Sequence, residues 1–192
     1  MVKVNAVGFL CPIPVIMTKK ALNEIEEGEV EILVDNETAK ENLEKLGKEL
    51  GFAYKSEKVD ENYKVVITKI KVEEKQEKIK EENIVVIIDS DEMGKGDKEL
   101  GEILVKGFVY SLTEMEVLPK TVILYNKGVY LATVNKNTIE DLKKLENMGV
   151  EVIACGTCVN YYGLQDKLQV GSLTNMYTII DRQFKATKII RV

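Results

Sequence analysis

The chain has 192 residues, 45% of them hydrophobic, and a net charge of −5 with acidic and basic residues mixed along its length. This length allows one large domain or two small ones, and the charge argues against a general nucleic-acid binder with a basic face. The absence of histidine excludes catalysis by a histidine base and most zinc-ligand sets. No apolar run approaches the ~18 residues of a membrane helix, and the start of the chain lacks a secretory signal, so we expect a cytoplasmic protein without membrane contact.

Residues 1–72 form the first predicted domain. Its apolar residues follow the periods of strands and helices. The helical period is clearest at Ala39, Leu43, Leu46 and Leu50, and Asn36 is a candidate N-cap of that helix. The order βαβαββ predicts a small two-layer α/β sandwich with two helices on one face of a sheet. The expected elements are a strand at Val2–Ala6, a helix at Pro12–Ile25, a strand at Val30–Val34, a helix from Asn36 to Gly51, and strands at Phe52–Val59 and Tyr63–Val72.

The composition changes abruptly in the segment Glu73–Asn83. All but one of its residues are charged or amide side chains, and it contains neither glycine nor proline. Such a segment is typical of a linker or a solvated helix extension. We therefore place the domain boundary here, which leaves residues 84–192 as the second domain.

Apolar strands recur along the second domain. Ile84–Ile88 is apolar at every position, as expected for a strand covered on both faces. Thr121–Tyr125, Val150–Ala154 and Lys188–Val192 are the other predicted strands. Their alternation with helical segments predicts a Rossmann-like parallel α/β domain.

Three helices are expected between and after these strands. Thr138 with Asp141 resembles a capping box at the start of the second helix. In the first helix, Leu100, Ile103, Leu104, Gly107 and Phe108 fit one helical face, and the last helix should contain Met176, Ile179, Ile180 and Phe184.

The cysteines are the most reactive side chains of this chain. There are three, an odd number, so a disulfide framework is not expected. Cys11 lies between Gly8, which frees the preceding turn, and the pair Pro12 and Pro14, which suit the first turn of a helix. At or near the N-cap its sulfur would face the positive end of the helix dipole, which favours the thiolate. The alternative is a small buried apolar residue beside a proline-rich turn.

Cys155 and Cys158 follow directly on a buried strand, with Gly156 between them suited to a tight turn. Reactive groups of open α/β sheets gather beyond the carboxyl ends of the strands, and two thiols at this spacing can form a dithiol/disulfide couple. A thioredoxin-like redox pair, half of a metal site completed by a second chain, and two inert packed cysteines are the alternatives.

The stretch Val4–Leu22 resembles the start of the TusA/SirA-like sulfur-carrier family, whose hallmark is a Cys-Pro-x-Pro motif after a short strand and a glycine-containing turn. The resemblance extends to about Val72. It implies that Cys11 receives sulfur as a persulfide and passes it on.

The second domain resembles the DsrE/DsrF-like sulfur-relay family in the stretch Val152–Leu164, where Gly163-Leu164 follows the cysteines. The resemblance implies that Cys155 is the reactive position. Cys158 departs from the single-cysteine pattern and is a candidate to resolve an intermediate on Cys155 as an internal disulfide.

The fusion of the two domains is similar to YedF-type proteins, with support from Asp89–Asp91 and Val170–Tyr177. This similarity implies a sulfurtransferase-like persulfide carrier linked to selenium metabolism, with sulfur- or selenium-donor and acceptor proteins as partners and homo-oligomer contacts through the second domain. We expect no cofactor beyond a transient cysteine adduct, no metal and no nucleic acid. The competing functions are a thiol-disulfide oxidoreductase built on the cysteine pair and a non-catalytic regulatory or scaffold module.

Overall fold

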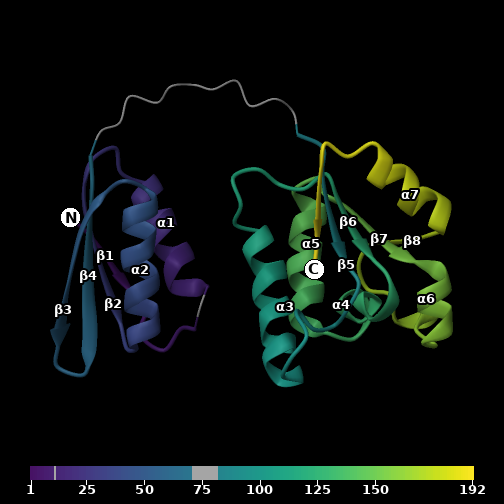
Figure 1. Cartoon of the computed structure of the whole chain (residues 1–192), viewed down its shortest axis with the longest axis horizontal. Coiled ribbons are helices and arrows are strands. Elements are labelled where there is room, and N and C mark those ends of the chain that lie inside the picture. The colour runs from purple at the N-terminus through teal and green to yellow at the C-terminus, as the bar shows by residue number, and fades with distance from the viewer. Residues whose placement is uncertain (11, 71–81) are drawn as a thin grey trace. The chain divides into compact units, whose positions relative to one another are not determined.

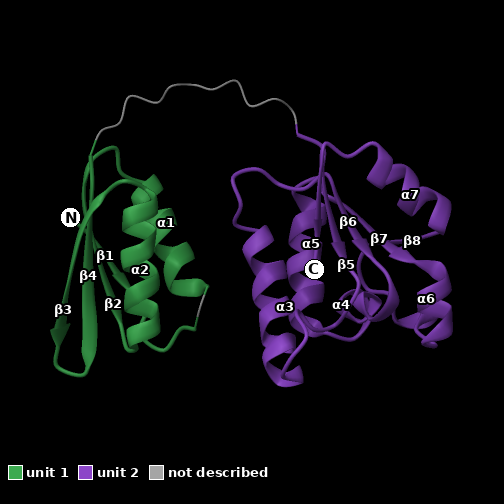
Figure 2. Cartoon of the chain, viewed as in Figure 1, with its two compact units in different colours: residues 1–77 green, residues 78–192 purple. Residues whose placement is uncertain are grey.

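The computed structural model describes residues 1–10, 12–70 and 82–192. The chain divides into two compact units, Met1–Glu77 and Lys78–Val192, which Figure 2 shows in different colours. Apart from Glu82 and Asn83, the predicted linker 73–83 lies outside the described residues. None of the described helices has the length and apolarity that crossing a bilayer requires.

The first unit is a sheet covered by two helices. Its described strands have the order β1-β2-β4-β3, with β1 parallel to β2 and the other neighbours antiparallel. Helices α1 and α2 lie on the same face of this sheet (Figure 1), so the predicted βαβαββ sandwich is confirmed. The elements are β1 (Val2–Asn5), α1 (Ile13–Asn23), β2 (Gly28–Val34), α2 (Glu37–Glu49), β3 (Ala53–Val59) and β4 (Asn62–Lys69).

Side chains make hydrogen bonds to two of the helix ends in this unit, the start of α2 and the end of α1. Asn36 caps α2 as predicted, because its Oδ1 accepts a hydrogen bond from the backbone N–H of Ala39 at 2.8 Å. Lys69 reaches from β4 to the end of α1, where its Nζ donates to the carbonyl oxygens of Leu22 and Ile25, both at 2.8 Å. A cation at this end also interacts favourably with the helix dipole.

The second unit is built on a parallel sheet, as predicted. Its described strands have the order β8-β7-β6-β5-β9, and every neighbouring pair is parallel. The elements are β5 (Ile84–Ile88), α3 (Lys98–Leu112), β6 (Thr121–Leu124), η1 (Asn126–Val129), α4 (Tyr130–Thr133), α5 (Lys136–Asn147), β7 (Glu151–Cys155), α6 (Gly156–Tyr161), η2 (Gln165–Lys167), β8 (Ser172–Thr174), α7 (Met176–Phe184) and β9 (Lys188–Arg191). The sequence patterns did not predict β8 or the short helices after β6.

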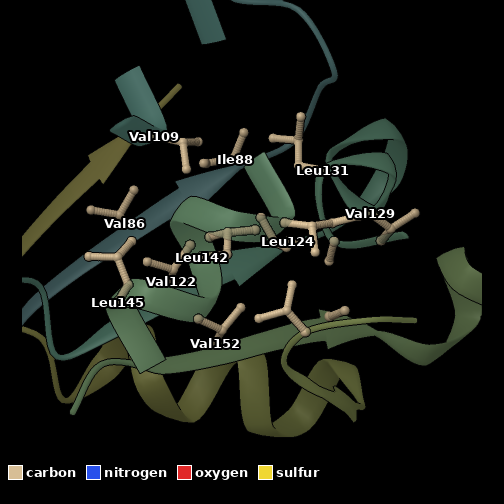
Figure 3. Close-up of a cluster of buried hydrophobic side chains, with 14 of the residues drawn as sticks. Val86, Ile88, Val109, Val122, Leu124, Val129, Leu131, Leu142, Leu145 and Val152 are labelled. Carbon is tan, nitrogen blue, oxygen red and sulfur yellow. The ribbon is translucent and has the colours of Figure 1, made fainter. Parts of the chain in front are cut away.

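Successive residues of the central strands face opposite sides of this sheet. Figure 3 shows one side, where Val86 and Ile88 of β5 join Leu142 and Leu145 of α5 in a cluster of buried side chains. On the other side, Ile179 of α7 packs over a second cluster formed by Val85, Ile87, Ile123, Ile153 and Cys155. One of the predicted site cysteines, Cys155, is therefore part of a hydrophobic core.

The apolar face predicted for α3 is only partly its buried face, since Phe108 is the one large side chain of that face that packs against the core cluster. Leu100, Ile103 and Leu104 are exposed, whereas Val105 and Val109 are fully buried. The helix carries two apolar stripes separated by about one residue, or roughly 100° around the axis. The buried stripe contains Gly101, Val105, Val109 and Leu112, and the helical period alone does not distinguish it from its neighbour.

The predicted capping box at Thr138 is also wrong. Helix α5 begins earlier, and Asn135 is its N-cap, accepting from the N–H of Thr138 at 3.4 Å. The hydroxyl of Thr138 is buried and donates to the carbonyl oxygen of Leu131 at 2.7 Å. Thr138 therefore joins α4 to α5 from inside the helix.

Candidate functional site

The carboxyl ends of the parallel strands meet at one edge of the second sheet, where ligands bind in folds of this kind. Asp89 follows β5, Asn126 follows β6, Cys155 ends β7 and Arg191 ends β9. These residues are distant in the sequence, and the parallel topology brings them to the same edge. This edge is the candidate site of the second unit.

Cys155 is the most enclosed reactive group at this edge. It is only 2% exposed, and it packs with Ile153 and Ile179 in an apolar cluster. It is both the last residue of β7 and the N-cap of α6, and its side chain makes no capping hydrogen bond. Its sulfur is therefore held in a largely water-free setting at the end of a rigid strand.

Cys158 lies one turn later on α6 and is only partly buried. It packs in the same cluster as Cys155, and the backbone N–H of Asn126 donates to its Sγ at 3.1 Å. Burial raises the pKa of the Cys158 thiol, the N–H of Asn126 lowers it, and the neighbouring Cys155 raises it, with a rise as the net result. Both cysteines are free in the structure. The pair is thus a contacting dithiol in which two thiolates disfavour each other.

Asn126 and Tyr162 complete this site, and the sequence analysis did not identify either. The Tyr162 hydroxyl donates to Asn126 Oδ1 at 2.7 Å. Asn126 also has a left-handed backbone, with φ of 49°. The signal available in the sequence was its position directly after the predicted strand Thr121–Tyr125, since strand ends supply the sites of parallel sheets.

A second polar group lies beside the cysteines. Arg191 contacts Asp89 through Nη2 at 2.6 Å and Nε at 2.8 Å, and it lies over the ring of Tyr125 at 5.9 Å from the centroid. Burial raises the pKa of Tyr125, against a smaller lowering by Arg191 and a rise from Asp89. Tyr125 packs against the same buried cluster that contains Cys155, so a phenol lies on the cysteine side of this sheet.

The two glycines predicted to support this site have structural roles. Gly156 opens α6 rather than a separate tight turn, and a Cβ there would lie 3.3 Å from the carbonyl oxygen of Thr174. Gly163 ends α6 with φ of 65°. The N–H groups of Gly163 and Leu164 then bond the carbonyls of Asn160 and Val159 at 3.1 and 2.9 Å, which is the Schellman arrangement that glycine favours.

Cys11 lies outside the described residues, but its neighbours on both sides are described. Gly8 has φ of 83° and its N–H donates to Asp35 Oδ2 at 2.8 Å. Pro12 is the N-cap of α1 and Pro14 its second residue, consistent with a proline-led helix start. Hydrogen bonds from Asn36 and Gly8 lower the pKa of Asp35, a residue that the sequence analysis did not single out.

No group of three or more histidine, cysteine, aspartate or glutamate side chains is placed to hold a metal ion within the described ranges.

Two protein families match this chain. The family described as sulfurtransferase TusA matches residues 2–69, and the DsrE/DsrF-like family matches residues 105–192, which include both described cysteines. A protein of Methanocaldococcus jannaschii named as a candidate sulfur carrier is 37% identical over 71 residues, which are 36% of this chain and 95% of the relative.

Two solved structures are similar to separate parts of the chain. The SirA-like protein of Desulfitobacterium hafniense is 39% identical and covers 35% of this chain and 96% of its own, with a TM-score of 0.34. The ychN protein of E. coli is 16% identical and covers 58% of this chain and 99% of its own, with a TM-score of 0.45.

Proposed function

The chain belongs to the TusA sulfurtransferase family, with a DsrE/DsrF-like domain fused behind its TusA/SirA-like domain, and from this premise we propose that it carries sulfur as a cysteine persulfide. In this proposal Cys11 is the carrier of the first domain and Cys155 that of the second. The partners are sulfur-donor and sulfur-acceptor proteins. Selenium is the alternative cargo, as the likeness to YedF-type proteins suggests.

The observation that supports this proposal best is the setting of Cys155. A strand end holds its sulfur in an apolar enclosure, in contact with a second thiol. In the loading step the Cys155 thiolate attacks the outer sulfur of a donor persulfide. The donor S–S bond breaks, the donor leaves as a thiolate, and Cys155 holds the outer sulfur without net oxidation. An apolar enclosure then limits the access of water and oxidants to the adduct.

The test is intact-protein mass spectrometry after brief exposure to a persulfide donor, on the wild type and on Cys11→Ser, Cys155→Ser and Cys158→Ser. Each bound sulfur adds ~32 Da to a thiolate-derived persulfide. We expect Cys11→Ser and Cys155→Ser each to bind less sulfur than the wild type. Bound sulfur that stays at the wild-type level in both variants would contradict the proposal, and a selenium donor in the same assay tests the alternative cargo.

Transfer from Cys11 to Cys155 is a separate part of this proposal. Under limiting donor, Cys11→Ser should abolish labelling of Cys155. Unchanged labelling would show that the two cysteines are loaded independently.

The packing of the free thiols Cys155 and Cys158 in one cluster also favours a second candidate function, a thiol-disulfide oxidoreductase. Two contacting thiols can form an internal disulfide without a large movement. Disulfide reductase turnover that survives Cys11→Ser but is lost in Cys158→Ser would favour this function over sulfur carriage.

A further inference from the structure

Asn126 lies outside α6 and makes two hydrogen bonds to it, one to Cys158 and one to its C-cap, Tyr162. The backbone N–H of Asn126 donates to Cys158 Sγ at 3.1 Å, and Oδ1 of the same asparagine accepts from the hydroxyl of Tyr162 at 2.7 Å. Cys158 lies within α6 and Tyr162 is its C-cap. One residue at the end of β6 therefore holds both the sulfur and the end of the helix that carries it.

The backbone of Asn126 supports a specialised role for this contact. Among the described residues, Asn126 and Asp60 are the non-glycine residues with a positive φ. Asp60 lies in the turn between β3 and β4, where this conformation is common. Asn126 instead follows a central strand at the candidate site, and sparsely populated backbone conformations cluster at functional sites.

The tyrosine that holds Asn126 is itself held in place. Its ring packs against Tyr130 with centroids 5.2 Å apart at 48°, and against Tyr161 at 5.2 Å and 86°. Aromatic pairs of this geometry fix the ring beyond the effect of burial alone. The phenol hydroxyl is consequently presented to Asn126 by a small aromatic cluster.

We propose that Cys158 is the resolving thiol of the second site, and that Asn126 and Tyr162 are positioning residues that hold its sulfur against Cys155. This inference rests on the proposed persulfide at Cys155. Cys158 Sγ attacks Cys155 Sγ, the bond from Cys155 to the outer sulfur breaks, and a Cys155–Cys158 disulfide forms. The outer sulfur takes the electron pair of the broken bond and the proton of the Cys158 thiol, and leaves as hydrogen sulfide.

This step balances without an external oxidant, since the Cys158 sulfur is oxidised from the thiol to the disulfide level while the outer sulfur is reduced from the persulfide to the sulfide level, and the Cys155 sulfur keeps its oxidation state. A dithiol reductant is needed afterwards to return the disulfide to the free pair. With selenium as cargo the product is selenide. The second site would therefore deliver the element in its fully reduced form, to a reaction that consumes sulfide or selenide.

The surroundings of Cys158 agree with this role. The N–H of Asn126 favours the thiolate, the form that attacks, and partly offsets the effect of burial on the pKa of Cys158. Cys155 is the titratable group that acts on the pKa of this sulfur. Tyr162 reaches it indirectly, through the hydrogen bond to Asn126.

The test uses the full chain loaded with a persulfide donor and freed of excess donor under anaerobic conditions. Intact mass and released sulfide are followed in time, and peptide mapping separates sulfur on Cys155 from sulfur on Cys11. Wild type should lose the Cys155 adduct, release sulfide and form the Cys155–Cys158 disulfide. Cys158→Ser should retain the adduct on Cys155.

Tyr162→Phe removes only the hydroxyl that holds Asn126. It should slow sulfide release roughly three- to ten-fold, the effect of one lost hydrogen bond. It should also move the pH profile of Cys158 alkylation upward, which a purely structural role would leave in place. Tyr161→Phe is the matched control, because Tyr161 is 83% exposed and its change leaves the bond between Tyr162 and Asn126 intact.

The outcomes separate this inference from the proposed function. If the adduct on Cys155 decays equally fast in wild type and Cys158→Ser, the inference is overturned and sulfur carriage stands. If neither protein forms an adduct on Cys155, both are overturned. If Tyr162→Phe and Tyr161→Phe behave alike, the positioning role is overturned.

Discussion

Arg182 holds Glu151 through a two-point ion pair, with Nε 2.7 Å from Oε2 and Nη2 2.9 Å from Oε1. Glu151 is the first residue of β7, the strand that ends at Cys155, and it also accepts from the hydroxyl of Thr121 at 3.0 Å. Arg182 lies on α7, the helix whose Ile179 packs in the same cluster as Cys155. The pair therefore fixes the helix that covers the cysteine side of the sheet.

Removing this ion pair should loosen α7 without unfolding the protein. Arg182→Met should lower the free energy of unfolding by about 0.5–1 kcal/mol near neutral pH, because water screens a partly exposed pair. Urea unfolding measures the change. Lys188→Met on the exposed part of β9 is a suitable control and should change stability by less than about 0.5 kcal/mol.

The effect of Arg182→Met should depend on pH. The hydrogen bonds from Arg182 hold the pKa of Glu151 below its ordinary value of 4.5, against a smaller rise from burial. The pKa of Glu151 is lower in the folded protein than in the unfolded chain. The ionised carboxylate therefore contributes fully to the free energy of unfolding above the ordinary pKa, and this contribution is lost as the pH falls through the folded pKa. The difference between wild type and Arg182→Met should therefore shrink in acid. An equally large difference at the acid end would contradict this assignment.

Gly128 should tolerate no side chain. A Cβ at this position would lie 2.1 Å from the carbonyl oxygen of Ile88 at the end of β5. Gly128→Ala must displace η1 and should cost about 1–3 kcal/mol of stability, the range for overpacking. Since η1 begins at Asn126, the same change should alter the alkylation rate of Cys158. Gly96→Ala is the control, because a Cβ there meets no atom within 4 Å, and equal stability of the two variants would refute the prediction.

The sequence predicts the strands of the second unit well because their signal is local. Ile84–Ile88 is apolar throughout, and all its residues are buried in the structure. The cysteine pair was found for a related reason, since thiols at a strand end are chemically distinctive. The contact between Asn126 and Cys158 could not be predicted in this way. It joins residues 32 positions apart and depends on the pairing of β6 with β7 and on a left-handed backbone that asparagine permits without requiring it.

Which face of α3 is buried could not be predicted for a different reason, because both apolar stripes of this helix fit a helical period. Substitutions in the two stripes test the assignment directly. Val105→Ala should lower the free energy of unfolding by about 1–3 kcal/mol, as the removal of buried methyl groups does. Leu104→Ala removes more carbon but lies at a position that is 45% exposed, so it should cost less than about 1 kcal/mol. If Leu104→Ala proves the more destabilising change, the stripe that includes Leu104 is covered in solution.

Asn126 allows the stability of the site to be separated from its chemistry. Asn126→Ala removes the acceptor for Tyr162 and places alanine at a φ of 49°, where a β-carbon costs about 1–2 kcal/mol. Asn126→Gly removes the same acceptor, but glycine adopts this conformation freely. We therefore expect Asn126→Ala to lower the melting temperature clearly and Asn126→Gly to lower it much less. Both variants should slow the alkylation of Cys158 to a similar degree, because both lose the bond that holds the Asn126 N–H. An alkylation rate that falls only in the less stable variant would show that the contact serves folding and not the reactivity of Cys158.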